Sequence, residues 1–210
     1  MVAELQFRLI FMAVFVTSVS ISAYYRRKAR ESGEAISRRA EGTVVLTLRA
    51  CGASVVLTSF LLYALIPRWM GWSALPLPQW VRWLGAGMGI ACLPLLWWVF
   101  RSIGENISET VLTKKEHRLV TYGPYRWVRH PLYGVALLEL LSLSLLASNW
   151  FIMLLCLIGT LVFRLAVIPV EERKLIEAFG EDYEDYRKRT GALVPRVHIF
   201  YRTKPDESRA

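Results

Sequence analysis

The sequence has few of the residues that build disulfides and metal sites. Its 210 residues include three cysteines and three histidines. Cys51, Cys92 and Cys156 each lie inside an apolar block, without a CxxC spacing and without a nearby pair of histidines. Disulfide frameworks and metal-binding motifs both depend on such spacings. We therefore expect no metal site and no disulfide, and we expect the cysteines to behave as small buried hydrophobic residues.

Acidic residues are also scarce relative to basic ones. The chain has 26 Lys and Arg against 17 Asp and Glu, a net charge of +9. Nucleic-acid binding is one interpretation of a basic chain, and loops that face anionic lipid are another. Hydrophobic residues make up 54% of the chain, in long runs flanked by the cations, and the mean hydropathy is +0.35. These runs favour a multi-pass integral membrane protein whose partners are membrane lipids, with no nucleic acid.

Five apolar blocks are candidate membrane spans, since crossing the hydrocarbon core takes roughly 20 residues. The first block is followed, not preceded, by its cations, which argues against a secretory signal peptide. We expect an all-α polytopic membrane bundle of about five transmembrane helices, divided into 1–100, with three spans, and 101–210, with a polar loop, a helical hairpin and a tail. The five blocks are Leu5–Tyr25, Thr43–Trp69, Val81–Phe100, Leu132–Leu146 and Trp150–Val170.

The distribution of Lys and Arg predicts the orientation. Cations are plentiful after the first and third blocks and in the C-terminal tail, whereas the loop after the second block has only Arg68 and Arg82. The positive-inside rule then places the N-terminus outside and the C-terminus in the cytoplasm, in a cell inner membrane or the endoplasmic reticulum. The polar loop and the tail share the cytoplasmic side.

The third block contains three closely spaced glycines, Gly85, Gly87 and Gly89. Small residues at this spacing let two helices approach closely. A dinucleotide-binding fingerprint is the alternative, but it needs a preceding strand and a charged ribose partner, and neither is present. Close helix packing is therefore the prediction.

One stretch, His117–Tyr133, is neither hydrophobic nor repetitive although hydrophobic blocks flank it. Gly123-Pro124 predicts a turn, and Pro131 suits the first turn of a helix. Aromatic residues alternate with cations along it. A polar, aromatic loop that ends at a helix N-terminus is suited to holding a small, partly anionic molecule.

A pair of acids, Glu171-Glu172, follows the fifth block. The plain interpretation is a favourable charge at the start of a tail helix. The turn at 147–149 makes the last two blocks an antiparallel hairpin, however, so the acids should lie beside His130. The tail after them repeats apolar residues at three- and four-residue steps, and Gly180 predicts a break between two amphipathic helices. Such a tail can lie on the membrane or cover the polar loop.

The pattern HxLVxxGPYxxxRHPxY, then the hairpin, EE and FGxxYxxYxxR, resembles the isoprenylcysteine carboxyl methyltransferase family, within a wider group that includes phospholipid N-methyltransferases. The resemblance covers roughly residues 110–190 and implies that 101–210 is the catalytic region. It implies S-adenosylmethionine as cofactor. The implied cofactor-binding residues are His117, Arg118, Leu119, Val120, Tyr125, His130, Pro131, Leu132, Tyr133, Glu171 and Glu172. For His117 and His130 taken singly, a structural hydrogen bond at the interface is the alternative.

The resemblance implies a lipophilic methyl acceptor that enters from the bilayer. A carboxylate acceptor is already ionised at pH 7 and needs no base, whereas an amine must first lose a proton. No spare base stands out, so a carboxylate of an isoprenylcysteine-like molecule is preferred to an amine. Where the family's prenylcysteine enzymes carry an arginine that holds the substrate, this chain has Val167, and the nearest arginine is Arg164.

Two ionisable residues lie inside apolar blocks, where an unpaired charge is costly. Glu139 and Arg164 fall at similar depths in the hairpin, so we expect them to form an ion pair at the inner end of the acceptor pocket, with catalytic or purely structural roles.

Two functions compete with methyl transfer. One is an NADPH-dependent sterol-type reductase, for which five spans are few, and the other is a lipid-binding protein without activity. The sequence leaves the acceptor's identity and the oligomeric state open.

Overall fold

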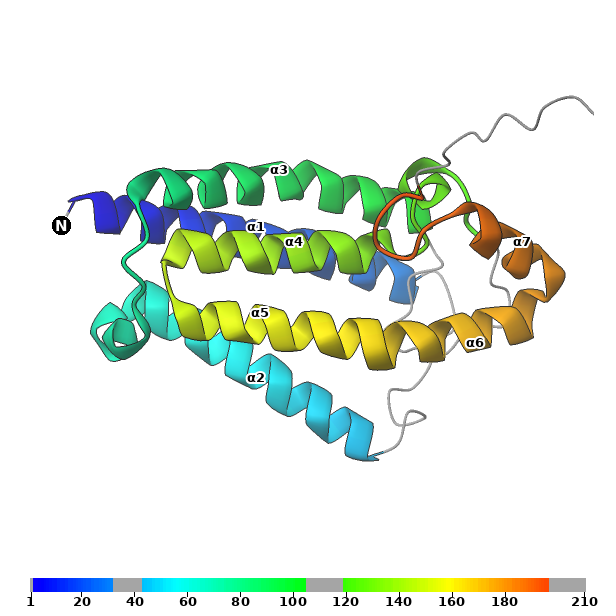
Figure 1. Ribbon diagram of the computed structural model, residues 1–210, viewed down its shortest axis with the longest axis horizontal. Helices are drawn as coiled ribbons and strands as arrows, with labels where there is room; N and C mark the ends of the chain where they lie inside the picture. Colours follow the sequence, from blue (N-terminus) through cyan, green and yellow to red (C-terminus); the bar gives the residue numbers. More distant parts are fainter. Residues whose placement is uncertain (1, 32–42, 105–118, 197–210) are drawn as a thin grey trace, which may run out of the picture.

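The computed structural model describes residues 2–31, 43–104 and 119–196, and His117 and Arg118 fall outside these ranges. Within them the chain is a bundle of helices and contains no strand longer than an isolated bridge (Figure 1), which confirms the predicted all-α architecture. The elements in order are α1 (Val2–Glu31), α2 (Thr43–Leu65), η2 (Pro67–Ser73), α3 (Gln79–Ile103), η4 (Gly123–Arg126), α4 (Pro131–Ala147), α5 (Trp150–Val162), η5 (Phe163–Val167), α6 (Ile168–Phe179) and α7 (Glu181–Arg189).

The apolar blocks form helices of unequal length. Among the described residues, three helices are long and apolar enough to cross a membrane by themselves: Ala3–Glu31, Gln79–Ile103 and Trp150–Phe179. The second block gives a fourth candidate only if α2 is taken together with η2, to which it is bent by 114°. The apolar helix α4 has 17 residues, about 26 Å of helix at 1.5 Å per residue. The protein is therefore an integral membrane protein whose hairpin has one short arm.

The helices α3 and α4 pack with little space between their backbones. A Cβ atom on Gly85 would lie 2.8 Å from the amide nitrogen of Leu146 and 2.9 Å from the carbonyl oxygen of Ser142. The Ser142 hydroxyl also donates a hydrogen bond of 2.7 Å to the carbonyl of Gly85. Gly89 faces Ser142 as well, whereas nothing lies within 4 Å of a Cβ on Gly87. The predicted close helix approach is confirmed at two of the three glycines.

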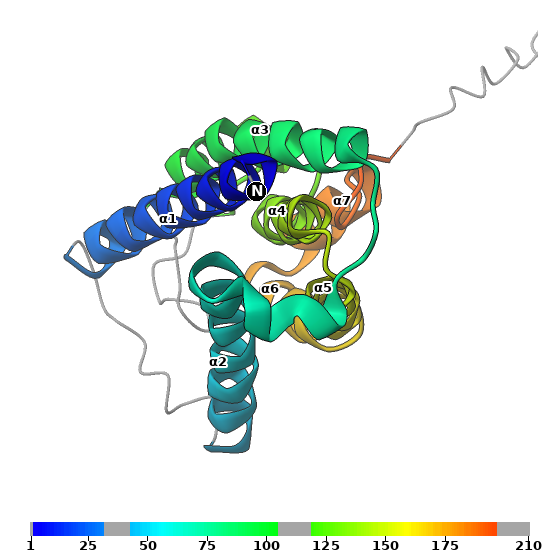
Figure 2. The same ribbon diagram turned by 90° about the vertical axis from the view of Figure 1, so that its left-hand side faces the viewer.

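The far end of the bundle, opposite α7, is held together by polar contacts of buried side chains. Arg82 of α3 forms an ion pair with Glu4 of α1, donates a hydrogen bond of 3.0 Å to the carbonyl of Leu146, and lies 4.0 Å over the ring of Phe7. Asn149 caps α5 by accepting from the amide of Ile152 at 3.1 Å. Aromatic rings of α1 and α2 pack against one another in the same part of the bundle. Figure 2 looks along the bundle from this end and shows α4 between α3 and α5.

The turn between α4 and α5 sets the position of the acidic pair. Ser148 adopts a left-handed conformation with φ of 53°, and Asn149 then starts α5, as the predicted tight turn requires. The helices α4 and α5 run antiparallel, so α6 ends up beside the start of α4 (Figure 1). Gly180, with φ of 54°, separates α6 from α7, which confirms the predicted break in the tail. Cys92 and Cys156 are buried as expected, but Cys51 is exposed on α2.

Candidate active site

The polar loop turns where the sequence predicts and is seated on α3. Gly123 has φ of 61° and begins the short helix η4 with Pro124. A Cβ atom on Gly123 would lie 2.5 Å from the hydroxyl of Ser102 and 3.2 Å from its Cβ. Any other residue here would be strained by the positive φ and would have to displace the Ser102 side chain on α3. The loop then leads directly into α4, which begins at Pro131 after the non-helical His130.

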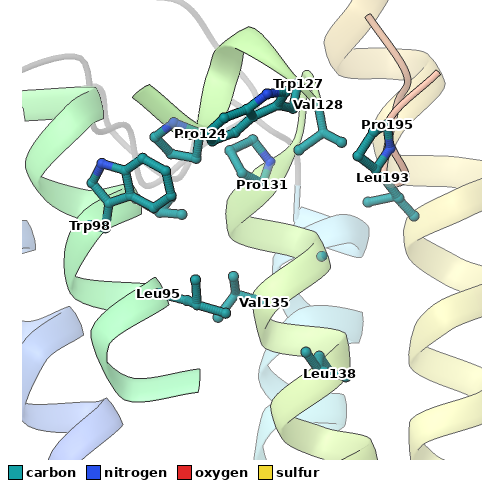
Figure 3. Close-up of a pocket in the computed structure, with 12 residues that line it drawn as sticks. Leu95, Trp98, Pro124, Trp127, Val128, Pro131, Val135, Leu138, Leu193 and Pro195 are labelled. Carbon is teal, nitrogen blue, oxygen red and sulfur yellow. The ribbon is translucent and has the colours of Figure 1, made fainter. Parts of the chain in front are cut away.

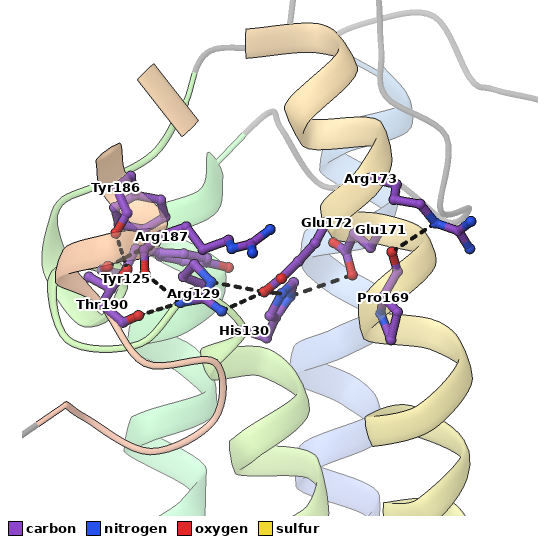
Figure 4. A network of polar contacts seen from close by, with 10 residues as sticks. All are labelled: Tyr125, Arg129, His130, Pro169, Glu171, Glu172, Arg173, Tyr186, Arg187 and Thr190. Atoms are coloured by element: carbon purple, nitrogen blue, oxygen red, sulfur yellow. Dashed lines mark hydrogen bonds and ion pairs between the residues drawn. The ribbon is translucent and has the colours of Figure 1, made fainter. Parts of the chain in front are cut away.

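The paired acids meet the loop at His130 and Arg129 (Figure 4). His130 Nδ1 lies 3.5 Å from Glu171 Oε2, and His130 Nε2 lies 3.3 Å from Glu172 Oε1. Arg129 Nε donates a hydrogen bond of 2.8 Å to Glu172 Oε1, and one of its terminal nitrogens lies 2.7 Å from the same oxygen. The prediction that the hairpin brings His130 and the acids together is confirmed.

The C-terminal tail covers the polar loop, which is one of the two positions predicted for it, the other being on the membrane surface. Tyr186 of α7 donates a hydrogen bond of 2.6 Å to the carbonyl of Tyr125. Arg129 donates to the carbonyls of Arg187 and Thr190. The backbone amides of Arg129 and His130 bond to carbonyls of residues 191 and 192 at 2.8 and 3.0 Å. The tail and the loop therefore form one polar unit at the end of the bundle.

Arg129 is the residue whose role the sequence did not reveal. In the sequence Arg129 is one of several cations in the polar loop, and only its position directly before His130 distinguishes it from the others. In the structure its side chain is 8% exposed and that of Glu172 is 15% exposed. Since it binds both the acidic pair and the tail, Arg129 joins three separate segments of the chain.

A small polar cavity of about 80 Å³ lies between the loop, α6 and α7. Two fully buried polar atoms here have no hydrogen-bond partner among the described residues: Oε2 of Glu171 and the hydroxyl of Tyr183. Burial, followed by the nearby acids, raises the pKa of Tyr125 and of Tyr183, so both hydroxyls keep their protons. The cavity is lined by Ile103, Leu119, Val120, Tyr125, Arg129, Glu171, Leu175, Phe179, Tyr183 and Tyr186.

A larger apolar cavity of about 610 Å³ lies on the other side of the loop, between α3, α4 and residues 193–195 (Figure 3). Its lining from the loop comprises Pro124, Trp127, Val128 and Pro131. Tyr125 and Arg129 instead line the polar cavity. The segment 124–131 is therefore a shared wall, apolar on one side and polar on the other.

The structure brings some of the predicted cofactor-binding residues together and separates others. Leu119, Val120, Tyr125 and Glu171 line the polar cavity, and His130 and Glu172 adjoin it through their contacts with Glu171 and Arg129. Pro131 lines the apolar cavity instead.

Two further residues of the motif point elsewhere. Leu132 packs against a buried cluster formed by α1 and α3. The ring of Tyr133 stacks between His130, at 5.7 Å, and Phe163, at 4.8 Å. Tyr133 thus supports the imidazole from the side of α5 and η5.

The expected ion pair between Glu139 and Arg164 is wrong. Glu139 is 9% exposed and lies near Ser18 of α1 and Cys92 of α3. Arg164 is exposed on the π-helical turn η5, and no ion pair joins the two within the described ranges. Helix rise alone gives the two residues matching depths, but the rotation of each helix about its own axis directs the two side chains differently.

Comparison with known proteins agrees with this arrangement. A family profile described as "Isoprenylcysteine carboxyl methyltransferase (ICMT) family" matches residues 85–177. The structure of a eukaryotic intramembrane Ras methyltransferase, an isoprenylcysteine carboxyl methyltransferase, superposes with a TM-score of 0.55 at 20% identity. The match covers 93% of this chain and 72% of that one, and it shows a shared fold.

Sequence relatives include metal-resistance proteins and prenylcysteine methyltransferases. The cobalt-zinc-cadmium resistance protein CzcN of Cupriavidus metallidurans is 31% identical over 158 residues, which cover 74% of this chain and 68% of CzcN. The protein-S-isoprenylcysteine O-methyltransferase of Schizosaccharomyces pombe is 35% identical over 103 residues, 45% of this chain and 41% of the yeast enzyme. The chain thus spans about two fifths of the yeast enzyme's length. On these matches the chain belongs to the isoprenylcysteine carboxyl methyltransferase family.

Proposed function

We propose that the protein is a membrane methyltransferase that transfers a methyl group from S-adenosylmethionine to a lipophilic acceptor. The observation that carries the proposal is the contact between the acidic pair and His130, at 3.3 and 3.5 Å, beside a polar cavity lined by motif residues. The hairpin forms these contacts between segments that are far apart in the sequence. They surround a cavity in which two polar atoms have no partner within the described part of the chain.

The residues around the polar cavity fit this cofactor. Glu171 Oε2 offers an acceptor for a cationic group, and the Tyr183 hydroxyl offers a donor for an anionic one. S-adenosylmethionine carries an ammonium and a carboxylate, and its sulfonium supplies an electrophilic methyl group when bound. Leu119, Val120 and Tyr125 would hold the cofactor, with Glu171 binding its positive charge. His130 would keep Glu171 oriented, while Arg129 neutralises Glu172.

The proposed acceptor is a carboxylate on an apolar chain, as in an isoprenylcysteine. The apolar cavity of about 610 Å³ is suited to such a chain and would admit it from the bilayer. Because a carboxylate is ionised at pH 7, the chain's residues have only to align the acceptor and exclude water. The wall 124–131 would hold the acceptor on one face and the cofactor on the other.

The first test measures cofactor binding by calorimetry in detergent. S-adenosylhomocysteine should bind saturably and NADPH should not, which separates a methyltransferase from a sterol-type reductase. Tyr125→Ala, His130→Ala and Glu171→Ala should each weaken binding at least tenfold, whereas Tyr122→Ala, at an exposed position of the same loop, should leave the affinity unchanged. Unchanged affinity in all three site variants would remove the site assignment.

The second test identifies the acceptor. Purified protein in lipid nanodiscs is incubated with radiolabelled S-adenosylmethionine and one of three acceptors: a prenylated cysteine with a free carboxylate, its methyl ester, or an aminophospholipid. The proposal predicts label only in the first. Label in the aminophospholipid would replace the carboxylate by an amine as the acceptor.

The proposed orientation places the N-terminus outside and the cofactor cavity on the cytoplasmic side, because the cations in the last turns of α1 and α7 lie at that end of the bundle. Reporter fusions after Arg196 should be active only in the cytoplasm. Activity of this reporter on the external side would refute both the orientation and the access route of the cofactor.

A further inference from the structure

The apolar cavity is a groove across one face of α4. Its lining residues on α4 recur at three- and four-residue steps, which places them on a single face of the helix. They are Pro131, Gly134, Val135 and Leu138. Leu95 and Leu138 are each 38% exposed, so the outer side of the groove is open to the surroundings of the bundle. An apolar chain can therefore enter it sideways from lipid.

The C-terminal strap, residues 191–196, forms one wall of this groove. Leu193 and Pro195 of the strap line it. Figure 3 shows both residues on the side of α4 opposite α3. The strap therefore supplies the wall that faces α3, and it comes from a part of the chain outside the motif of the polar loop.

Main-chain contacts hold the strap in place. The backbone amides of Arg129 and His130 donate to the carbonyls of residues 191 and 192 at 2.8 and 3.0 Å. A Cβ atom on Gly191 would collide with the carbonyl of Val194, so the chain folds back tightly at this glycine. The position of the strap thus depends on its backbone and not on its apolar side chains.

Gly134 leaves the floor of the groove bare beside the strap. Outside its own helix, an added Cβ atom would have a single neighbour within 4 Å in the described part of the chain, the carbonyl oxygen of Leu193 at 3.6 Å. This is an ordinary van der Waals distance, so a methyl group would fit without strain and would take up space in the groove. Glycine inside a helix is less stable than alanine, so the bare floor has a reason outside the helix itself.

We infer that Gly134 and Leu193 determine the cross-section of the apolar chain that the acceptor carries. The bare floor at Gly134 admits the methyl branches of a chain, and Leu193 is the wall against which the chain packs. The groove shares the wall 124–131 with the polar cavity, so a chain that lies in it has its polar end near the cofactor side. The inference rests on the proposed function and deepens it, because it names residues that select the acceptor.

The test compares two acceptors of equal chain length, N-acetyl-S-farnesyl cysteine with methyl branches and N-acetyl-S-dodecyl cysteine without them. Gly134→Ala should lower kcat/KM for the farnesyl acceptor about tenfold relative to the dodecyl acceptor, mainly through KM, because one methyl group in an apolar site changes selectivity by about this factor. Leu193→Ala should raise the same ratio, because a straight chain loses its contact with the wall whereas a branched chain fills the new space. Val194→Ala, at an exposed position of the strap, and Gly87→Ala, on the open face of α3, are the matched controls and should leave the ratio unchanged.

Two further readouts separate chain selection from folding and from cofactor binding. Both variants should bind S-adenosylhomocysteine as the wild type does, since neither residue lines the polar cavity. Gly134→Ala should melt no lower than the wild type, because alanine favours the helix. A ratio that changes in neither variant, or that changes as much in the controls, would overturn the inference.

Acceptor affinities, measured by calorimetry with S-adenosylhomocysteine bound, give the same ratio without any activity. If the wild type binds the two acceptors but methylates neither, the proposed function fails, and the affinity ratios of the variants still decide on the groove. If the wild type binds S-adenosylhomocysteine but neither acceptor, the inference fails while the cofactor assignment stands.

Discussion

Adding one methyl group at Gly85 should separate α3 from α4. The new Cβ would lie 2.8 Å from the amide nitrogen of Leu146 and 2.9 Å from the carbonyl oxygen of Ser142. Ordinary carbon contacts are about 3.5–4.0 Å, so the helices must move apart by roughly 0.5–1 Å. Both neighbours are backbone atoms, and no side-chain rotation can relieve the contact.

The expected loss for Gly85→Ala follows from opposing terms. Overpacking a close contact costs about 1–3 kcal/mol, and weakening the hydrogen bond from Ser142 to Gly85, 2.7 Å long, costs about 1 kcal/mol more. Alanine returns about 1 kcal/mol through its better helix propensity. We therefore expect Gly85→Ala to destabilise the protein by about 1–3 kcal/mol.

The assay is reversible unfolding in detergent, with Gly87→Ala as the matched control two residues away in the same helix. A Cβ on Gly87 would have nothing within 4 Å, so this variant should be unchanged or up to about 1 kcal/mol more stable. Equal stability of the two variants would refute the conclusion that α3 and α4 are in backbone contact at Gly85.

Three further predictions concern other contacts. Arg129→Met should destabilise the protein by about 3 kcal/mol, because it leaves Glu172 partly buried without its main partner. The variant should also be cleaved faster by trypsin in the tail. Adding Glu172→Gln should recover part of the lost stability, and no recovery would contradict the ion pair. Asn149→Ala should cost about 1–2 kcal/mol and speed hydrogen exchange in the first turn of α5, since it removes the cap; unchanged exchange would argue against it. Arg82→Met should lower the melting temperature more than Glu4→Gln, because Arg82 is buried and Glu4 is 60% exposed; equal losses would contradict this.

The hairpin is the part of the architecture that the sequence predicted most fully. Ser148 and Asn149 form the turn, and Gly180 separates the two tail helices. A short turn between two apolar helices leaves little choice but an antiparallel arrangement, and the rise per residue is constant. The start of the fourth apolar block and the end of the fifth must therefore lie at the same end of the hairpin, which is why the sequence alone predicts that His130 lies near Glu171.

The rotation of each helix about its own axis does not follow from distances along the chain. Glu139 and Arg164 have similar depths, but Glu139 faces α1 and α3, and Arg164 lies on a π-helical turn that changes the helix phase. A π turn has no composition signal of its own, and packing against neighbouring helices decides which face is buried.

By itself the sequence determined an all-helical membrane protein, its turns, its family and the pairing of the RHP motif with the two acids, because these depend on local composition and on distance along the chain. Only the tertiary structure decided that the tail covers the loop, that Arg129 joins loop, acids and tail, and that the Tyr183 hydroxyl is buried without a partner from residues 2–31, 43–104 and 119–196. These features arise from contacts between segments about 40 to 60 residues apart, whose side-chain directions are set by packing and not by sequence spacing.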